Sequence, residues 1–148
     1  MTTHFLVLFA ALLPAAADAP VTDVNASDLA KMQGEWMVAS ITNDGIKRSD
    51  DEAQTLFRTV TANQYTIFLF NKPISRGTFK IDATKKPKTI DSTPPGPPGK
   101  SKPILGIYEF NGDTLKICNA PPGMPRPTNF EAKAGSNHMR IVWQPEKK

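Results

Sequence analysis

The stretch that decides the fold begins Arg76-Gly77-Thr78-Phe79-Lys80-Ile81-Asp82. It continues through Leu105-Gly106-Ile107-Tyr108-Glu109-Phe110 and Gly112-Asp113-Thr114-Leu115-Lys116-Ile117-Cys118. Each segment is a short run containing β-branched or aromatic residues, and turn-forming residues separate the runs. None has the spacing of three to four residues between apolar positions that marks an amphipathic helix. The stretch therefore predicts consecutive short antiparallel strands.

The same pattern extends to both sides of this stretch. Ser49-Asp50-Asp51-Glu52 is a capping box, which predicts a short helix to about Phe57. A series of about eight antiparallel strands with short connections predicts an all-β, up-and-down barrel with this short helix after the first strand, because closure removes exposed strand edges. The expected strands span residues 36–42, 59–70, 77–82, 88–91, 104–110, 114–118, 128–132 and 139–144.

The repeated phrases between Arg76 and Phe130 resemble the small exported domain family that is abundant in planctomycetes and has lipocalin-like features. That family is recognised by its recurrent sequence and not by an activity. Gly34 and Trp36 also resemble the lipocalin signature, in which the tryptophan closes the base of the barrel. The resemblance implies a lipocalin-like barrel domain over residues 29–148.

The N-terminal residues have the pattern of a secretory leader. An apolar run from Phe5 to Ala17 ends in small residues and is too short for a permanent bilayer-spanning helix. We expect residues 1–17 to be a signal peptide, followed by a flexible lead-in over residues 18–28. The mature protein is then exported, periplasmic or extracellular, and has no transmembrane segment. The alternative interpretation is a buried N-terminal helix of a cytosolic protein.

Composition limits the function classes. The chain has 148 residues and a net charge of +4, which predict one domain, and we expect a monomer. Its densest basic group, residues 85–88, lacks the interleaved aromatic residues of a nucleic-acid site. His138 is the one histidine beyond the leader, so a multi-histidine metal site is excluded and no cofactor is expected.

The strongest nucleophile candidate is the only cysteine, Cys118, with His138 as its base. The expected strand order places them near opposite barrel ends, on the order of 15–20 Å apart. A base must lie within about 3 Å of the proton that it takes. We therefore expect no catalytic residue, and a hydrolase or isomerase is the least favoured interpretation.

Strand alternation directs a set of mostly apolar side chains into the barrel, where they either fill the core or line a cavity. The leading hypothesis is an exported, non-catalytic binding domain for a small apolar molecule. The alternative is a structural or protein-interaction module of the cell envelope with a filled core. Tyr108 is the expected polar contact of a ligand. The predicted interior residues are Trp36, Phe79, Ile81, Tyr108, Met139 and Ile141.

Strict alternation of strand direction also assigns the connections to the two ends of the barrel. The proline-rich loops Thr93–Lys100 and Ala120–Pro127 are expected to share one rim, with Trp36 at the same end and the capped helix at the other. Pro94-Pro95-Gly96-Pro97-Pro98 is either a structural cover or a docking segment for a partner.

Overall fold

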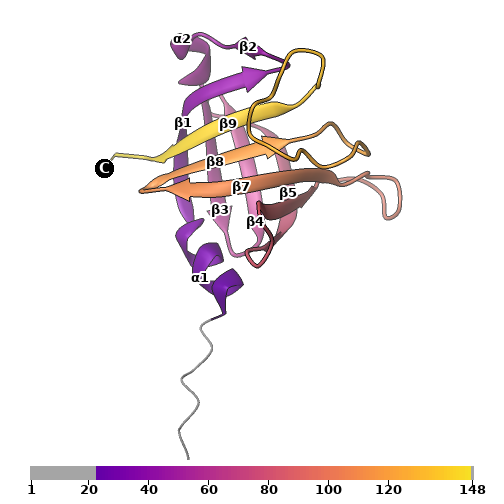
Figure 1. Cartoon of the computed structure of the whole chain (residues 1–148). Helices are drawn as coiled ribbons and strands as arrows, with labels where there is room; N and C mark the ends of the chain where they lie inside the picture. Colours follow the sequence, from indigo (N-terminus) through magenta and orange to yellow (C-terminus); the bar gives the residue numbers. More distant parts are fainter. Residues whose placement is uncertain (1–22, 148) are drawn as a thin grey trace, which may run out of the picture.

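The computed structural model describes residues 23–147 and is shown in Figure 1. Eight strands close an antiparallel barrel through the pairing of β9 with β1, and β2 extends the sheet beside β1. The predicted all-β barrel with a short capped helix after the first strand is confirmed. The elements are α1 (Val24–Lys31), β1 (Gly34–Asn43), β2 (Ile46–Lys47), α2 (Asp50–Ala53), β3 (Leu56–Thr61), β4 (Gln64–Leu69), β5 (Lys72–Asp82), β6 (Lys88–Thr93), β7 (Ile104–Asn111), β8 (Thr114–Asn119) and β9 (Met139–Pro145).

The connections alternate between two ends of the barrel. One end, called the closed end below, carries α1, the turns at residues 62–63 and 112–113, and the loop 83–87. The other, called the open end, carries α2, the turn at residues 70–71 and the two long loops 94–103 and 120–138 (Figure 1). The long loops meet where Gly123 N–H donates to the Pro103 carbonyl at 3.3 Å, so the expectation that they share a rim is correct.

The predicted single strand 59–70 is wrong, because the chain reverses within it and forms the hairpin of β3 and β4. Ala62 adopts the left-handed backbone at φ 53°, without glycine. Gln33 holds this turn from outside: its Nε2 donates to the Ala62 carbonyl at 3.0 Å, and its Oε1 accepts from Ala62 N–H at 2.7 Å. The additional turn reverses the assignment of ends, so Trp36 lies at the closed end, opposite the long loops.

The predicted strand 128–132 is also absent. Ala132 has a φ of 46°, which interrupts an extended run. Arg140 Nη1 donates to the Phe130 carbonyl at 3.0 Å, and Phe130 packs on Ile107, Cys118 and Ala132. These apolar residues therefore attach a loop to the outside of β7 and β8.

The predicted signal peptide and the first part of the predicted lead-in, residues 18–22, lie outside the described residues. From Val24 onward the prediction of a flexible lead-in is wrong, because α1 begins there. Asp23 is its N-cap and accepts from Asn25 N–H at 2.9 Å. The side chain of Asp28 is almost completely buried against the barrel.

Helix α1 closes one end of the barrel with apolar and polar contacts. Met32, directly after the helix, is completely buried, and its carbonyl accepts from Trp36 Nε1 at 2.9 Å. Trp36 is 5 % exposed, and its backbone pairs with Pro145 of β9. Trp36 is thus buried beside β9, at the end of the barrel opposite the long loops.

Candidate functional site

The open half of the barrel contains a cavity of about 360 Å³. Ser92, Ile104 and Met139, at the open-end termini of their strands, line its outer part. Most of its wall is aliphatic, because these residues alternate inward along their strands. The aliphatic wall includes Ile41, Leu56, Ile67, Ile90, Ile117 and Ile141.

Arg58 is the one charged side chain among the described residues that line this cavity. Strand β3 directs it inward together with Leu56 and Val60, because all three share one face of the strand. Arg58 is only 5 % exposed. Its guanidinium carbon lies 5.4, 5.3 and 6.0 Å from the ring centres of Tyr65, Phe79 and Trp143, respectively.

The aromatic rings stabilise the positive charge through their faces, but they do not provide oxygen acceptors for its N–H groups. Arg58 Nε is buried and has no hydrogen-bond partner within residues 23–147. Burial lowers the pKa of Arg58 to about 10, against the opposing influence of Tyr65. The guanidinium therefore stays charged at neutral pH. It lies beside an apolar cavity, and no carboxylate within residues 23–147 pairs with it.

A second polar group of the cavity wall is also unsatisfied. The Oδ1 atom of Asn119, at the open-end terminus of β8, is buried and has no donor within the described part of the chain. Buried polar atoms normally have a hydrogen-bond partner. The cavity thus combines a long apolar wall with two polar atoms, Arg58 Nε and Asn119 Oδ1, that no described residue satisfies.

The predicted interior residues divide between a filled and a hollow part. Met139 and Ile141 line the cavity. Trp36, Phe79 and Tyr108 are buried in the packed core, and Ile81 packs against it. Both interpretations of the interior apply, since the closed half is filled and the open half is hollow.

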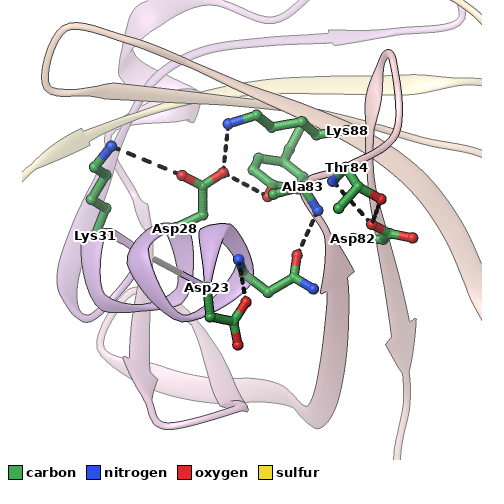
Figure 2. Close-up of polar contacts among 9 residues, drawn as sticks. Asp23, Asp28, Lys31, Asp82, Ala83, Thr84 and Lys88 are labelled. Atoms are coloured by element: carbon green, nitrogen blue, oxygen red, sulfur yellow. Dashed lines mark hydrogen bonds and ion pairs between the residues drawn. The ribbon is translucent and has the colours of Figure 1, made fainter. Parts of the chain in front are cut away.

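The hydroxyl of Tyr108, which we expected to contact a ligand, is bound to Asp28 of α1. Figure 2 shows Asp28 between Lys31 and Lys88. Asp28 Oδ2 accepts from Tyr108 Oη at 2.8 Å and from Lys88 Nζ at 2.7 Å, while Lys31 Nζ lies 3.9 Å from Oδ1. Burial raises the pKa of Asp28, but the hydrogen bonds from Lys88 and Tyr108 and the two lysine charges outweigh it, so the pKa lies below 3.8. Burial, followed by the bond to Asp28, raises the pKa of Tyr108. This cluster fastens the helix.

Asn25 makes a second attachment of α1, to the loop after β5. Its Oδ1 accepts from the backbone N–H of Ala83 at 2.7 Å (Figure 2). Asp82 shapes that loop by accepting from the backbone N–H of Thr84 at 3.0 Å and from its hydroxyl at 2.5 Å. The closed end is therefore held by residues from α1, β5, β6 and β7.

We expected Cys118 and His138 to lie near opposite ends of the barrel. This prediction is wrong, because both lie toward the open end. The register pairs Cys118 with Arg140, two residues after His138, because residues 128–132 do not insert a further strand. The Cys118 side chain points away from the barrel and is completely buried beneath Phe130 and Ala132. Burial raises the pKa of its thiol, although the positive charge of Arg140 acts to lower it. A thiol with a raised pKa stays protonated, and a protonated thiol is a poor nucleophile.

Within residues 23–147, no group of three or more histidine, cysteine, aspartate or glutamate side chains is arranged to hold a metal ion. In the same part of the chain, no helix has the length and apolar character needed to cross a membrane. Two surface grooves are larger than the cavity in the barrel. One, of about 570 Å³, is lined mainly by polar groups such as Gln54 and Gln144. The other, of about 610 Å³, is lined mainly by polar groups such as Lys80 and Lys85.

Comparisons of this chain with protein-family models, with curated proteins and with solved structures give no match. The site is therefore interpreted from its own geometry. Arg58 was not among the predicted site residues, although the alternation Leu56, Arg58, Val60 places a charged residue between two apolar ones on the same strand face.

Proposed function

We propose that this protein is a non-catalytic binding protein that holds a small, largely apolar molecule inside its barrel. The single observation that supports this function best is the cavity of about 360 Å³ in the open half. Sites for small molecules are typically about 300–1,000 Å³, mostly apolar, with a few polar groups that fix orientation. This cavity matches that description in size and in the character of its wall.

A neutral dye tests the proposal directly. N-phenyl-1-naphthylamine carries no charge at neutral pH, and its fluorescence increases in apolar surroundings. We expect saturable binding at one site of the folded protein. Ile141→Trp should abolish this binding, because Ile141 lines the cavity and the larger side chain fills it.

Val142→Trp is the matched control. Val142 neighbours Ile141 on β9 and points to the opposite face of the strand, so the same large side chain is added outside the barrel. This variant should bind the dye as the unchanged protein does. Absence of saturable binding to the unchanged protein, or equal loss in both variants, would contradict binding inside the barrel.

Export is the second part of the proposal. It is supported by the apolar run from Phe5 to Ala17 and by the resemblance of residues 76–130 to an exported domain family with lipocalin-like features. The place of action is then the periplasm or the exterior of the cell. The intact mass of the protein recovered outside the cytoplasm should correspond to a chain that begins at Asp18. A recovered chain that retains Met1 would contradict the proposed processing.

A protein-interaction module of the cell envelope is the second candidate, and the open end supports it. Large apolar side chains are exposed there, among them Ile46 (71 %), Phe70 (70 %), Ile74 (56 %) and Met124 (52 %). Exposed apolar groups of this kind gather at surfaces that bind partners. This function predicts that a partner isolated from the envelope is lost with Phe70→Ser, while dye binding does not change.

A further inference from the structure

The unpaired guanidinium in the cavity indicates the chemical class of the ligand. Resting on the proposed binding function, we infer that the ligand is an amphipathic monocarboxylate. Its carboxylate pairs with Arg58 at the inner end of the cavity, and its hydrocarbon chain extends along the aliphatic wall toward the open end.

Burying Arg58 is costly for the folded protein. Removing a charged group from water costs several kcal/mol unless it gains a partner of opposite charge and hydrogen bonds. Arg58 is 5 % exposed, and none of the ion pairs between described residues includes it. A ligand that carries a negative charge would supply this missing partner.

The surroundings of the guanidinium limit the direction in which it can bind a ligand. Tyr65, Phe79 and Trp143 lie near the cation, with their ring centres 5.3 to 6.0 Å from the guanidinium carbon. A guanidinium carries five N–H donors in its plane. A carboxylate matches two of these donors in a bidentate pair, which gives both strength and orientation. The aromatic residues hold the charge in place, and its polar edge remains available.

The charges of the cavity wall favour a ligand with a single negative charge. Among the described residues of the cavity wall, Arg58 is the only cation, and the other polar groups are neutral serine, tyrosine, tryptophan and asparagine side chains. A monocarboxylate would be neutralised by this single guanidinium. A phosphate dianion would retain an uncompensated charge in an apolar cavity, which is costly.

The volume of the cavity limits the size of the ligand. A water molecule occupies about 30 Å³ in the liquid, and a methylene group is of similar size. A cavity of about 360 Å³ therefore holds roughly twelve non-hydrogen atoms. Decanoate has this number of non-hydrogen atoms and a single negative charge. Because the cavity reaches the open end, the end of a longer chain would extend past Ile74 and Met139.

Three ligands that share one chain and differ in the head group test this inference in the unchanged protein. Decanoate, decan-1-ol and decylamine should each be titrated against bound N-phenyl-1-naphthylamine, with the two ionic compounds below their micelle-forming concentrations and decan-1-ol below its solubility limit. Hydrogen bonds to a charged group predict that decanoate displaces the dye at a concentration about tenfold to a hundredfold lower than decan-1-ol. Decylamine should be the weakest competitor, because its positive charge faces Arg58.

Arg58→Met assigns the preference to the guanidinium. Methionine retains an unbranched side chain without charge, so decanoate should lose its advantage while the dye still binds. Arg76→Met makes the same change on an exposed side chain of β5 and should leave the preference unaltered. Carbon-13 NMR of decanoate labelled at the carboxyl carbon measures the pKa of the bound carboxylate directly. This pKa should be lower than that of free decanoate. The difference between the two pKa values should disappear in Arg58→Met.

Each outcome separates the inference from the function on which it rests. If the dye binds and decanoate and decan-1-ol displace it equally well, binding in the barrel stands and the monocarboxylate inference is wrong. If the preference persists in Arg58→Met, the assignment to Arg58 is wrong. If the unchanged protein does not bind the dye and binds none of the three ligands, the proposed function itself fails. The comparison of head groups in the unchanged protein decides the ligand class even if Arg58→Met does not fold.

Discussion

The two ends of the barrel are built from the same strands and differ in how their polar groups are used. At the closed end, the carboxylate of Asp28 accepts from Tyr108 and Lys88, and Met32 and Trp36 are buried beside it. Toward the open end, the interior contains a cavity, and Arg58 Nε is buried without a hydrogen-bond partner among the described residues. One end thus gains stability from satisfied contacts, while the other contains a buried charge that no described residue satisfies.

The largest expected effect lies at the closed end. Trp36→Ala removes a buried ring that packs beneath α1, and large-to-small changes of this kind cost about 3–5 kcal/mol. Denaturant-induced unfolding should show a loss in this range. A loss below about 1 kcal/mol would mean that the closed end is not the packed part of the barrel.

The next effect is at the cluster that fastens α1. Asp28→Asn keeps the shape of the side chain and removes its negative charge. Lys88 would then donate to a neutral amide oxygen and no longer to a carboxylate. We expect the free energy of unfolding to fall by about 2 kcal/mol. Tyr108→Phe, which leaves the pair of Asp28 and Lys88 in place, should cost about 1 kcal/mol. Equal stability of Asp28→Asn and the unchanged protein would show that the helix is held by its apolar contacts alone.

The same carboxylate gives the closed end a dependence on pH. The pKa of Asp28 in the folded protein lies below its ordinary value of 3.8. Its stabilising contribution is therefore complete above about pH 4 and is lost as the pH falls through the folded pKa. Unfolding experiments between neutral and acidic pH should show a smaller acid-induced loss of stability in Asp28→Asn than in the unchanged protein. Parallel curves would contradict this assignment.

A smaller effect on stability is expected at the boundary between the two ends. Arg58→Met removes three contacts between the cation and aromatic rings, but it also removes the cost of burying the charge. The free energy of unfolding without ligand should change by no more than about 1 kcal/mol. A loss much larger than this would identify Arg58 as a structural residue, and the contrast between the two ends would then disappear.

The smallest effect is expected at the rim of the open end. Ile74 is 56 % exposed, and exposed substitutions usually change stability by less than about 0.5 kcal/mol. Ile74→Ser should remain within this limit in thermal and denaturant unfolding. A larger loss would show that the rim packs more closely than its exposure indicates.

The sequence allowed most strands to be predicted, because alternation and turn residues are local properties. The hairpin at Ala62 could not be predicted in this way, since it lacks glycine and is held by Gln33, 29 residues earlier in the chain. Phe130 was assigned to a strand because an apolar residue in an extended run has the same local pattern whether it pairs in a sheet or packs as a loop on its outer surface.

The candidate site was predictable only in part. Period-two alternation correctly directed Met139 and Ile141 into the interior. It also directs Arg58 inward, but the predicted strand began one residue too late to include it. Asp28 could not be identified as the partner of Tyr108, because their contact joins residues 80 positions apart across a helix and a strand. Long-range contacts decide which part of the interior is filled.

The path of the chain has a practical consequence for attaching this molecule to something else. Helix α1 begins at the end of the barrel where β9 finishes, and Glu146 N–H donates to the Glu35 carbonyl at 3.1 Å beside the start of β1. Both ends of the described chain thus lie at the closed end, whereas the long loops lie at the open end (Figure 1). A tether, tag or fused domain at either terminus therefore orients the open end outward and keeps its access to the surrounding medium clear.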